Sequence, residues 1–263
     1  GGVDAGGRDA VNDLSYLILD SEEEVGLTAE ELVIRISSRN PDGYVVRACE
    51  VARNLSGKLK FVSDDSTIAA LVQFGLPEQL ARDYISCGCH CPMVPAVNQI
   101  SAGVIFNYPL MLELALNNGV HRQSGRQLGP RTGDPGSFSN LTEIEDAFEQ
   151  QFEAMYRPAM AFKNADMYLF ATQMPCPLIS SFYGSCLERG DDFFNFGIEP
   201  YAGHVTGICG LPNIADSLAA IQKVIFTDKA ADMAELSQAL ATNFEGRKEL
   251  LQKLRDAPKF GND

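Results

Sequence analysis

Three of the seven cysteines and one of the three histidines lie together at Cys87, Cys89, His90 and Cys91. In an extended segment side chains alternate between two faces, so the three cysteines would share one face and His90 would take the other. Alternate residues of a strand lie about 6.5 Å apart. This spacing is marginal for a disulfide and too long for neighbouring ligands of one zinc ion, whose bonds to sulfur are about 2.3 Å.

The residue types of this cluster leave three interpretations open. A structural zinc site needs the segment to curl, which Gly88 permits, and it also needs a distant fourth ligand. No C-x-x-C or H-x-x-x-H motif elsewhere in the sequence supplies one. The second interpretation is three small buried side chains without a chemical role. The third is a reactive thiol on a shaped loop.

The cluster resembles the cysteine loop of glycyl radical enzymes, the pyruvate formate-lyase superfamily. Many eliminases and decarboxylases of this family carry G-C-x-E-P where this chain has Gly88-Cys89-His90-Cys91-Pro92. The resemblance runs in order over essentially the whole chain. The other segments that are similar to the family's are residues 1–4, 7–10, 12–16, 106–107, 112–119, 129–135, 213–221, 243–246 and 257–263.

The resemblance implies radical chemistry. In this family a separate activase, which uses S-adenosylmethionine and an iron–sulfur cluster, converts a glycine near the C-terminus to a radical. The radical passes to the loop cysteine, whose thiyl takes a hydrogen from the substrate and returns it after bond cleavage. By position, Cys89 would be that cysteine. The implied fold is α/β, part of the family's ten-stranded α/β barrel with the cysteine loop inside the barrel.

One departure from the family pattern concerns Cys91, which stands where many members have a glutamate. That glutamate serves as a general base, and an ordinary thiol has a pKa of about 8.5 against about 4.3 for glutamate. A thiol at this position is a poor base at neutral pH unless a neighbouring cation such as His90 favours the thiolate. Pyruvate formate-lyase itself uses two adjacent cysteines, and fumarate-adding members lack the glutamate. Cys89 and Cys91 are therefore the candidate catalytic residues, with the substrate left open.

A second departure is the absence of the family's R-V-x-G-[YF] radical motif from these 263 residues. The sequence also begins where the family would already have an N-terminal half. We therefore expect residues 1–263 to form a partial barrel domain that is inactive alone, without the N-terminal half and the C-terminal glycyl radical domain. An intact mass well above that of these residues would test this expectation.

The elements before the loop alternate between strands and helices. Short apolar runs predict strands, and apolar residues at helical spacing predict helices, with Asp64 or Asp65 expected as a helix cap. This order is typical of parallel strands with helices outside. The expected elements are helix 9–20, strand 32–36, helix 42–53, strand 59–62, helix 67–74 and a helical turn or two over 77–84.

The elements after the loop are mainly helical. A capping-box spacing from Thr142 to Glu145 predicts a helix start, and Pro212 is suited to the first turn of another helix. A short apolar run, residues 167–171, predicts a strand. The expected helices are 108–118, 142–156, 212–227, 233–243 and 247–255, with a strand end entering a helix over 175–187.

The remaining candidate site residues have structural alternatives. The glycine-rich segment 124–140 predicts a long irregular loop, which we interpret as a turn that packs near the active site rather than a phosphate cradle, because G-x-x-x-x-G-K-[ST] is absent. His121 and His204 are either substrate contacts or structural residues. Cys49, Cys176 and Cys186 are expected in the core.

Composition excludes several classes of function. The formal net charge of −14 disfavours nucleic acid and anionic membranes as partners. No run of about 18 apolar residues predicts a membrane span, and no secretory signal is visible. An odd number of clustered cysteines is typical of reduced thiols in a cytosol, and the resemblance implies an oxygen-free cytoplasm.

The sequence thus predicts the barrel portion of an anaerobic glycyl radical lyase, of dehydratase or decarboxylase type. No dissociable cofactor is expected in this chain. The implied partners are a small-molecule substrate and the radical-generating activase, and the resemblance allows a homodimer of the full-length enzyme. The alternatives are a fumarate-adding or acyltransferase-type member, an inactive split or degenerate scaffold that binds a partner chain, and a zinc module.

Overall fold

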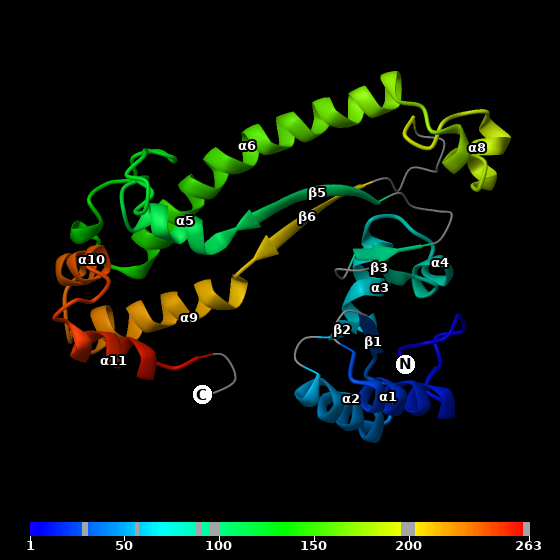
Figure 1. The fold of residues 1–263 in the computed structure, drawn as a ribbon, viewed down its shortest axis with the longest axis horizontal. Coiled ribbons are helices and arrows are strands. Elements are labelled where there is room, and N and C mark those ends of the chain that lie inside the picture. The colour runs from blue at the N-terminus through cyan, green and yellow to red at the C-terminus, as the bar shows by residue number, and fades with distance from the viewer. Residues whose placement is uncertain (28–30, 56–57, 88–90, 95–99, 196–202, 260–263) are drawn as a thin grey trace. The chain divides into compact units, whose positions relative to one another are not determined.

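The computed structural model describes residues 1–27, 31–55, 58–87, 91–94, 100–195 and 203–259. The chain forms two compact units (Figure 1). Unit 1 comprises residues 1–102 and 169–205, and unit 2 comprises residues 103–168 and 206–263.

Unit 1 begins with a strand–helix–strand arrangement. Helix α1 (Asp13–Val25) is followed by β1 (Leu32–Ile36), α2 (Asp42–Asn54) and β2 (Leu59–Ser63). The two strands pair in parallel, with Leu32 opposite Leu59 and Ile36 opposite Ser63. A core of Leu19, Ile34, Ala48 and Val51 lies between these elements. The predicted alternation of strands and helices is confirmed here, as is the parallel pairing.

The next elements of unit 1 lead to the cysteines. Helix α3 (Asp64–Gln73) and α4 (Glu78–Arg82) precede two short strands, β3 (Ile85–Cys87) and β4 (Cys91–Met93). The predicted cap of α3 was wrong. Ser63 caps the helix through its hydroxyl, which accepts from the backbone of Ser66, and Asp65 instead accepts from Ser37 and the backbone of Ser38. The helix therefore starts three residues earlier than predicted.

The last part of unit 1 contains two short helices, α7 (Pro177–Ser180) and α8 (Gly184–Arg189). The sequence predicted one helix running to residue 187, but the chain turns between them. The Asp192 carboxylate organises this region, because it accepts from the Cys176 backbone at 2.7 Å and from the Ser180 hydroxyl at 2.8 Å.

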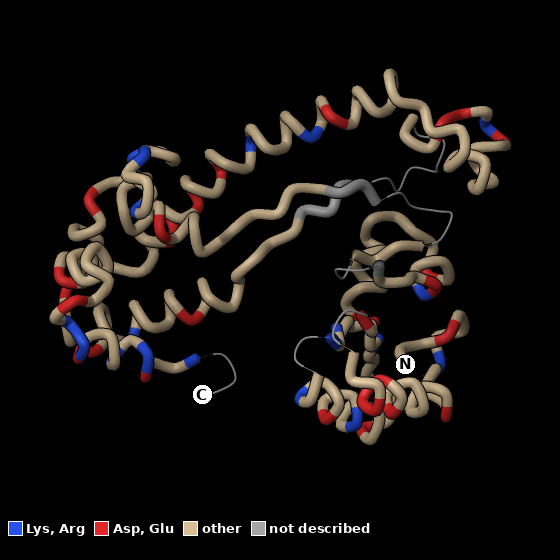
Figure 2. The backbone as a smooth tube through the Cα atoms, in the orientation of Figure 1, with Lys and Arg blue, Asp and Glu red and all other residues tan. Residues whose placement is uncertain are grey.

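Strands β5 (Ile100–Asn107) and β6 (Gly203–Cys209) pair with each other and point the same way (Figure 1). Neither strand was predicted from the sequence. Neither strand contains Lys, Arg, Asp or Glu in its sequence, and Figure 2 draws the described part of each in tan. Strands of this composition are typical of parallel sheets that are covered on both faces.

The helices of unit 2 surround an apolar core that contains Leu112, Ile144, Ile221 and Leu236. They are α5 (Tyr108–Ala115), α6 (Leu141–Gln173), α9 (Leu211–Ile221), α10 (Met233–Ala241) and α11 (Lys248–Asp256), with a 3₁₀ turn η1 (Pro135–Ser137) and a π-helical turn η2 (Gln222–Thr227). The predicted helices are confirmed near their expected positions, except that the helix expected over 142–156 continues to Gln173. None of the described helices is both long and apolar enough to cross a membrane.

Two predictions in this region were wrong. Residues 167–171 are not a strand but belong to α6, which continues through Pro158 to Gln173. The start of α6 is not a Thr142 capping box, because the Asn140 side chain accepts from the Glu143 backbone at 3.1 Å.

Candidate active site

The two strands that flank the predicted thiol cysteine form an antiparallel pair. Cys87 lies opposite Cys91, Ser86 opposite Pro92 and Ile85 opposite Met93. We call this pair the cysteine hairpin. Residues 88–90, which include Cys89 and His90, lie outside the described residues, as does the side chain of Cys87. Cys91 is half-buried at the first position of β4.

The zinc interpretation falls mainly on residues outside the description, so it stays a hypothesis. Within the described ranges, no group of three or more His, Cys, Asp or Glu side chains could hold a metal ion.

Both strands of the cysteine hairpin are rooted in a buried apolar cluster. Tyr84 directly precedes β3 and Val94 directly follows β4, and each is 1 % exposed. They pack with Leu71, Leu76 and Ala81. The start of β3 and the end of β4 are therefore fixed by hydrophobic burial of Tyr84 and Val94.

A buried ion pair lies at the same root. The Arg35 guanidinium donates from Nε to Asp64 Oδ1 at 2.8 Å and from Nη2 to Asp64 Oδ2 at 2.9 Å. The Tyr84 hydroxyl donates to Asp64 Oδ1 at 2.7 Å, and the Arg35 guanidinium carbon lies 4.2 Å from the centre of the Tyr84 ring. The Asp64 side chain has no exposed surface.

The electrostatics of the ion pair fix the protonation of its partners. Burial raises the pKa of Tyr84, and the Asp64 carboxylate raises it further. Burial opposes the charge of Arg35, but hydrogen bonds and attraction from Asp64 outweigh it and raise the Arg35 pKa. At neutral pH Tyr84 is therefore a neutral donor and Arg35 a cation.

Ser86 was not singled out from the sequence. Its hydroxyl is buried, and it has no hydrogen-bond partner within the part of the chain that the structure describes. A buried hydroxyl usually has a partner, so this group one residue before Cys87 is a candidate polar contact for the site. A lone serine in a short strand carries no sequence signal of this kind.

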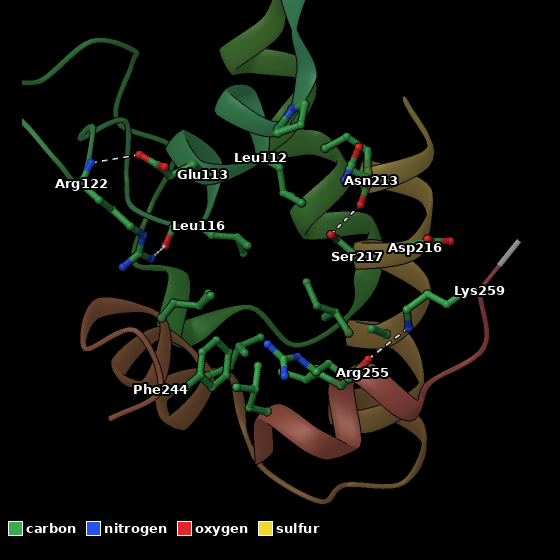
Figure 3. Close-up of a pocket in the computed structure, with 18 residues that line it drawn as sticks. Leu112, Glu113, Leu116, Arg122, Asn213, Asp216, Ser217, Phe244, Arg255 and Lys259 are labelled. Atoms are coloured by element: carbon green, nitrogen blue, oxygen red, sulfur yellow. Dashed lines mark hydrogen bonds between the residues drawn. The ribbon is translucent and has the colours of Figure 1, made fainter. Parts of the chain in front are cut away.

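Unit 2 contains a cavity of about 540 Å³ between α5, α9, α10 and α11. Figure 3 shows Leu112, Leu116 and Phe244 around it. Two of the three cations that line it donate to backbone carbonyls. Arg122 donates to the Leu116 carbonyl at 3.1 Å, and Lys259 donates to the Ala257 carbonyl at 2.7 Å. This cavity offers mainly apolar surface with a few polar side chains, and neither Cys91 nor His121 is among the residues that line it.

The other predicted site residues also have structural partners or fall outside the description. His121 Nδ1 lies 2.8 Å from the Ser124 hydroxyl, and its Nε2 lies 4.0 Å from Glu113. These contacts favour the structural interpretation of His121. The side chain of His204 lies outside the described residues. Cys186 is buried as expected, but the expected core position was wrong for Cys49, which is exposed because α2 buries Ala48 and Val51 instead, and for Cys176, which is half-buried. The glycine-rich loop is attached to α6, because the buried Gln151 amide donates to the Pro130 carbonyl at 2.8 Å.

The order of these elements around the cysteine hairpin can be compared with known proteins. A family model described as "Pyruvate formate lyase-like" matches residues 1–263. The chain belongs to this family. The resemblance stated from the sequence is thereby confirmed.

Members of the pyruvate formate lyase-like family also match along the whole chain. The chain is 33 % identical over 264 residues to trans-4-hydroxy-L-proline dehydratase of Clostridioides difficile, covering 100 % of this chain and 33 % of the relative. It is 34 % identical over 273 residues to isethionate sulfite-lyase of Bilophila wadsworthia, covering 100 % of this chain and 32 % of the relative. The chain thus spans about a third of the length of these relatives.

Solved structures of the pyruvate formate lyase-like family confirm the fold. The crystal structure of hydroxyproline dehydratase from Clostridioides difficile with substrate bound has a TM-score of 0.85 at 33 % identity, over 100 % of this chain and 33 % of that chain. The glycerol-bound B12-independent glycerol dehydratase from Clostridium butyricum has a TM-score of 0.82 at 31 % identity, with the same coverage. The predicted α/β barrel fold is therefore confirmed, while the roles of Cys89 and Cys91 stay predictions.

Proposed function

We propose that this chain is the catalytic-barrel portion of an anaerobic glycyl radical lyase in which Cys89 carries the thiyl radical. The thiyl takes a hydrogen atom from a small substrate and becomes a thiol. The substrate radical then loses a leaving group by C–X or C–C cleavage, and the thiol returns the hydrogen. The observation that carries the proposal is the match with dehydratases and lyases over the whole chain.

The relatives indicate the class of substrate. Their names describe loss of water from trans-4-hydroxy-L-proline, loss of sulfite from isethionate and decarboxylation of 4-hydroxyphenylacetate. All three are small polar molecules, and the proposed substrate belongs to the same class. A dehydratase or sulfite-lyase type of reaction ranks above decarboxylation, because the decarboxylase subunit is only 23 % identical.

The proposal includes partners that lie beyond these residues. The chain holds no dissociable cofactor, and a glycyl radical on a further segment is installed by an activase that uses S-adenosylmethionine and an iron–sulfur cluster. The full-length enzyme works in an oxygen-free cytoplasm, with a homodimer as its proposed assembly. Oxygen-free conditions and exclusion of water suit radical intermediates.

Cys91 favours a second candidate function. Its thiol occupies the position of the family's glutamate, so a reaction that needs no carboxylate base there is compatible with this chain. A fumarate-adding or acyltransferase-type member fits this requirement. An inactive scaffold that binds a partner chain is the remaining alternative.

The test uses the full-length protein, activated anaerobically and incubated with trans-4-hydroxy-L-proline, isethionate, glycerol and 4-hydroxyphenylacetate. We expect turnover of a compound in this class, with Cys89→Ser abolishing turnover while the glycyl radical signal in electron paramagnetic resonance remains. Cys49→Ser, which changes an exposed cysteine of α2, is the matched control and should retain activity. Turnover by Cys89→Ser would rule out the proposed role. Failure of the wild-type protein to gain a radical signal would favour the scaffold.

A further inference from the structure

Asp64 is the centre of a fully satisfied hydrogen-bond network at the root of the cysteine hairpin. Its carboxylate accepts from Arg35 Nε and Nη2, from the Tyr84 hydroxyl and from the backbone of Val3 at 2.7 Å. Four donors match the acceptor capacity of a carboxylate. The group therefore has a single geometry, because any rotation would break several hydrogen bonds at once.

The N-terminal segment closes over this carboxylate. Gly2 has a φ of +74°, and a Cβ atom at this position would lie 2.3 Å from Asp64 Oδ2. Only glycine accommodates both the conformation and the close approach. The segment is fastened again by Asn40, whose side chain accepts from the Gly2 backbone at 3.1 Å and donates to the Gly2 carbonyl at 2.8 Å.

Arg35 connects this carboxylate to the backbone that leads into the hairpin. Its Nη1 donates to the carbonyl of Tyr84, the residue before β3, at 3.0 Å. Its Nη2 donates to the carbonyl of Arg82, the last residue of α4, also at 3.0 Å. Because these contacts are to the main chain, they fix the path of the backbone into β3 and not only a side chain.

A role in stability alone does not account for this arrangement. Buried ion pairs contribute little net stability compared with apolar side chains of similar volume, because both charges lose their hydration. Arg35 side-chain exposure is 21 % and that of Asp64 is 0 %. An ion pair whose planar guanidinium also binds two backbone carbonyls, those of Arg82 and Tyr84, instead provides a defined geometry.

We propose that Arg35, Asp64 and Tyr84 are positioning residues that set the path of β3, the strand that precedes Cys89 in the sequence and on which the reactivity of the Cys89 thiol depends. The inference rests on the proposed function for the importance of that thiol. The network itself acts through β3 and touches no reacting atom.

The test compares variants of the full-length protein. Tyr84→Phe removes one hydroxyl and keeps the ring, and Arg35→Lys keeps the charge but cannot donate to the carboxylate and both carbonyls in the same planar geometry. Glu22→Gln is the matched control, because it weakens another ion pair of unit 1, with the buried Lys58. Asp64→Asn is included if this variant folds. If it does not fold, Tyr84→Phe and Arg35→Lys still test the inference.

The first readout needs no substrate. Cys89 is alkylated anaerobically with iodoacetamide, and mass spectrometry gives its rate relative to that of Cys49 in the same molecule. We expect the ratio to shift at least threefold in Tyr84→Phe or Arg35→Lys and to stay unchanged in Glu22→Gln. An unchanged ratio in both variants, with a lower unfolding temperature, would mean a purely stabilising role and would overturn the inference.

The second readout is kinetic. On the compound that the wild-type protein turns over, we expect the variants to lose about tenfold in kcat with KM within twofold, because a misplaced thiol slows hydrogen abstraction more than substrate binding. Equal losses in the control would contradict the inference. Turnover by Cys89→Ser would instead refute the proposed function, and the alkylation ratio would still report on the network.

Discussion

By the sequence resemblance, the thiol of Cys91 stands where many members of the family have a glutamate, and this predicted exchange is testable through pH. Ordinary pKa values are about 8.5 for a thiol and about 4.3 for a glutamate. If Cys91 acts as a general base during turnover, the ascending limb of the pH–kcat profile reports its pKa. Cys91→Glu should then move this limb to lower pH by several pH units. Cys91→Ala is the control for loss of the group. Identical profiles in all three proteins would show that Cys91 takes no part in proton transfer.

Asp192 gives a second prediction at the scale of a single residue. Burial raises the pKa of its carboxyl group, but hydrogen bonds from the Phe194 backbone, the Ser180 hydroxyl and the Cys176 backbone outweigh burial and lower the pKa below its ordinary value of 3.8. Because the pKa of Asp192 is lower in the folded state than in the unfolded state, its ionised carboxylate stabilises the folded state. This contribution is complete at pH values above the unfolded-state pKa and is lost as the pH falls through the folded-state pKa.

The measurement is hydrogen exchange of residues 176–194 in wild-type protein and Asp192→Asn, compared at each pH from 7 to 3. We expect several-fold slower exchange in the wild type at neutral pH and a difference that narrows below about pH 4. Asp191→Asn, a neighbour that does not bond Cys176 or Ser180 in the described contacts, is the control. A difference that is constant over the whole range would contradict the assignment.

Residue-level prediction succeeded where a contiguous motif carried the information. The segment around Cys89 and Cys91 and the similar segments along the rest of the chain are such motifs, so the family could be named from them together. The network of Arg35, Asp64 and Tyr84 has no motif, because each residue is unremarkable in its own element. Their contacts become visible only when the chain has folded.

At the scale of elements, the attachment of the glycine-rich loop to α6 depends on Gln151. Its amide donates to the Pro130 carbonyl and, at 3.2 Å, to the Thr132 hydroxyl. Gln151→Leu would leave the Pro130 carbonyl without this donor, at a cost of about 1–3 kcal/mol. Hydrogen exchange in residues 118–134 should become faster. Gln150→Leu, on the exposed neighbour, should leave exchange unchanged, and equal effects of both variants would contradict this role.

The elements show why the sequence predicts some structure and not the rest. Helices with clear periodicity, such as α2 and α10, begin at the predicted residue and end within two residues of the predicted end. The apolar run at residues 167–171 was mistaken for a strand, because a short apolar run does not distinguish the two structures. The preceding residues 159–166 are mostly good helix formers, and they extend α6 through the run.

At the scale of the whole molecule, several large apolar side chains lie exposed in these 263 residues. Phe74 is 82 % exposed, Phe182 is 77 % and Phe162 is 72 %. Since the relatives are about three times longer, we expect further parts of a full-length chain to cover such surface. Residues 1–263 expressed alone should bind the dye ANS strongly and show no turnover, whereas the full-length protein should bind little dye. Equal ANS binding per molecule by residues 1–263 and by the full-length protein would contradict this expectation.

The sequence separations within the Arg35 network have a consequence for folding. The contacts of Asp64 join it to residues 29 and 61 positions away, and Arg35 reaches Tyr84 across 49 positions. Contacts of such separation form late, because the chain must first lose the entropy of closing long loops. The backbone that leads into β3 is thus fixed only when the segments around Val3, Arg35 and Asp64 have come together.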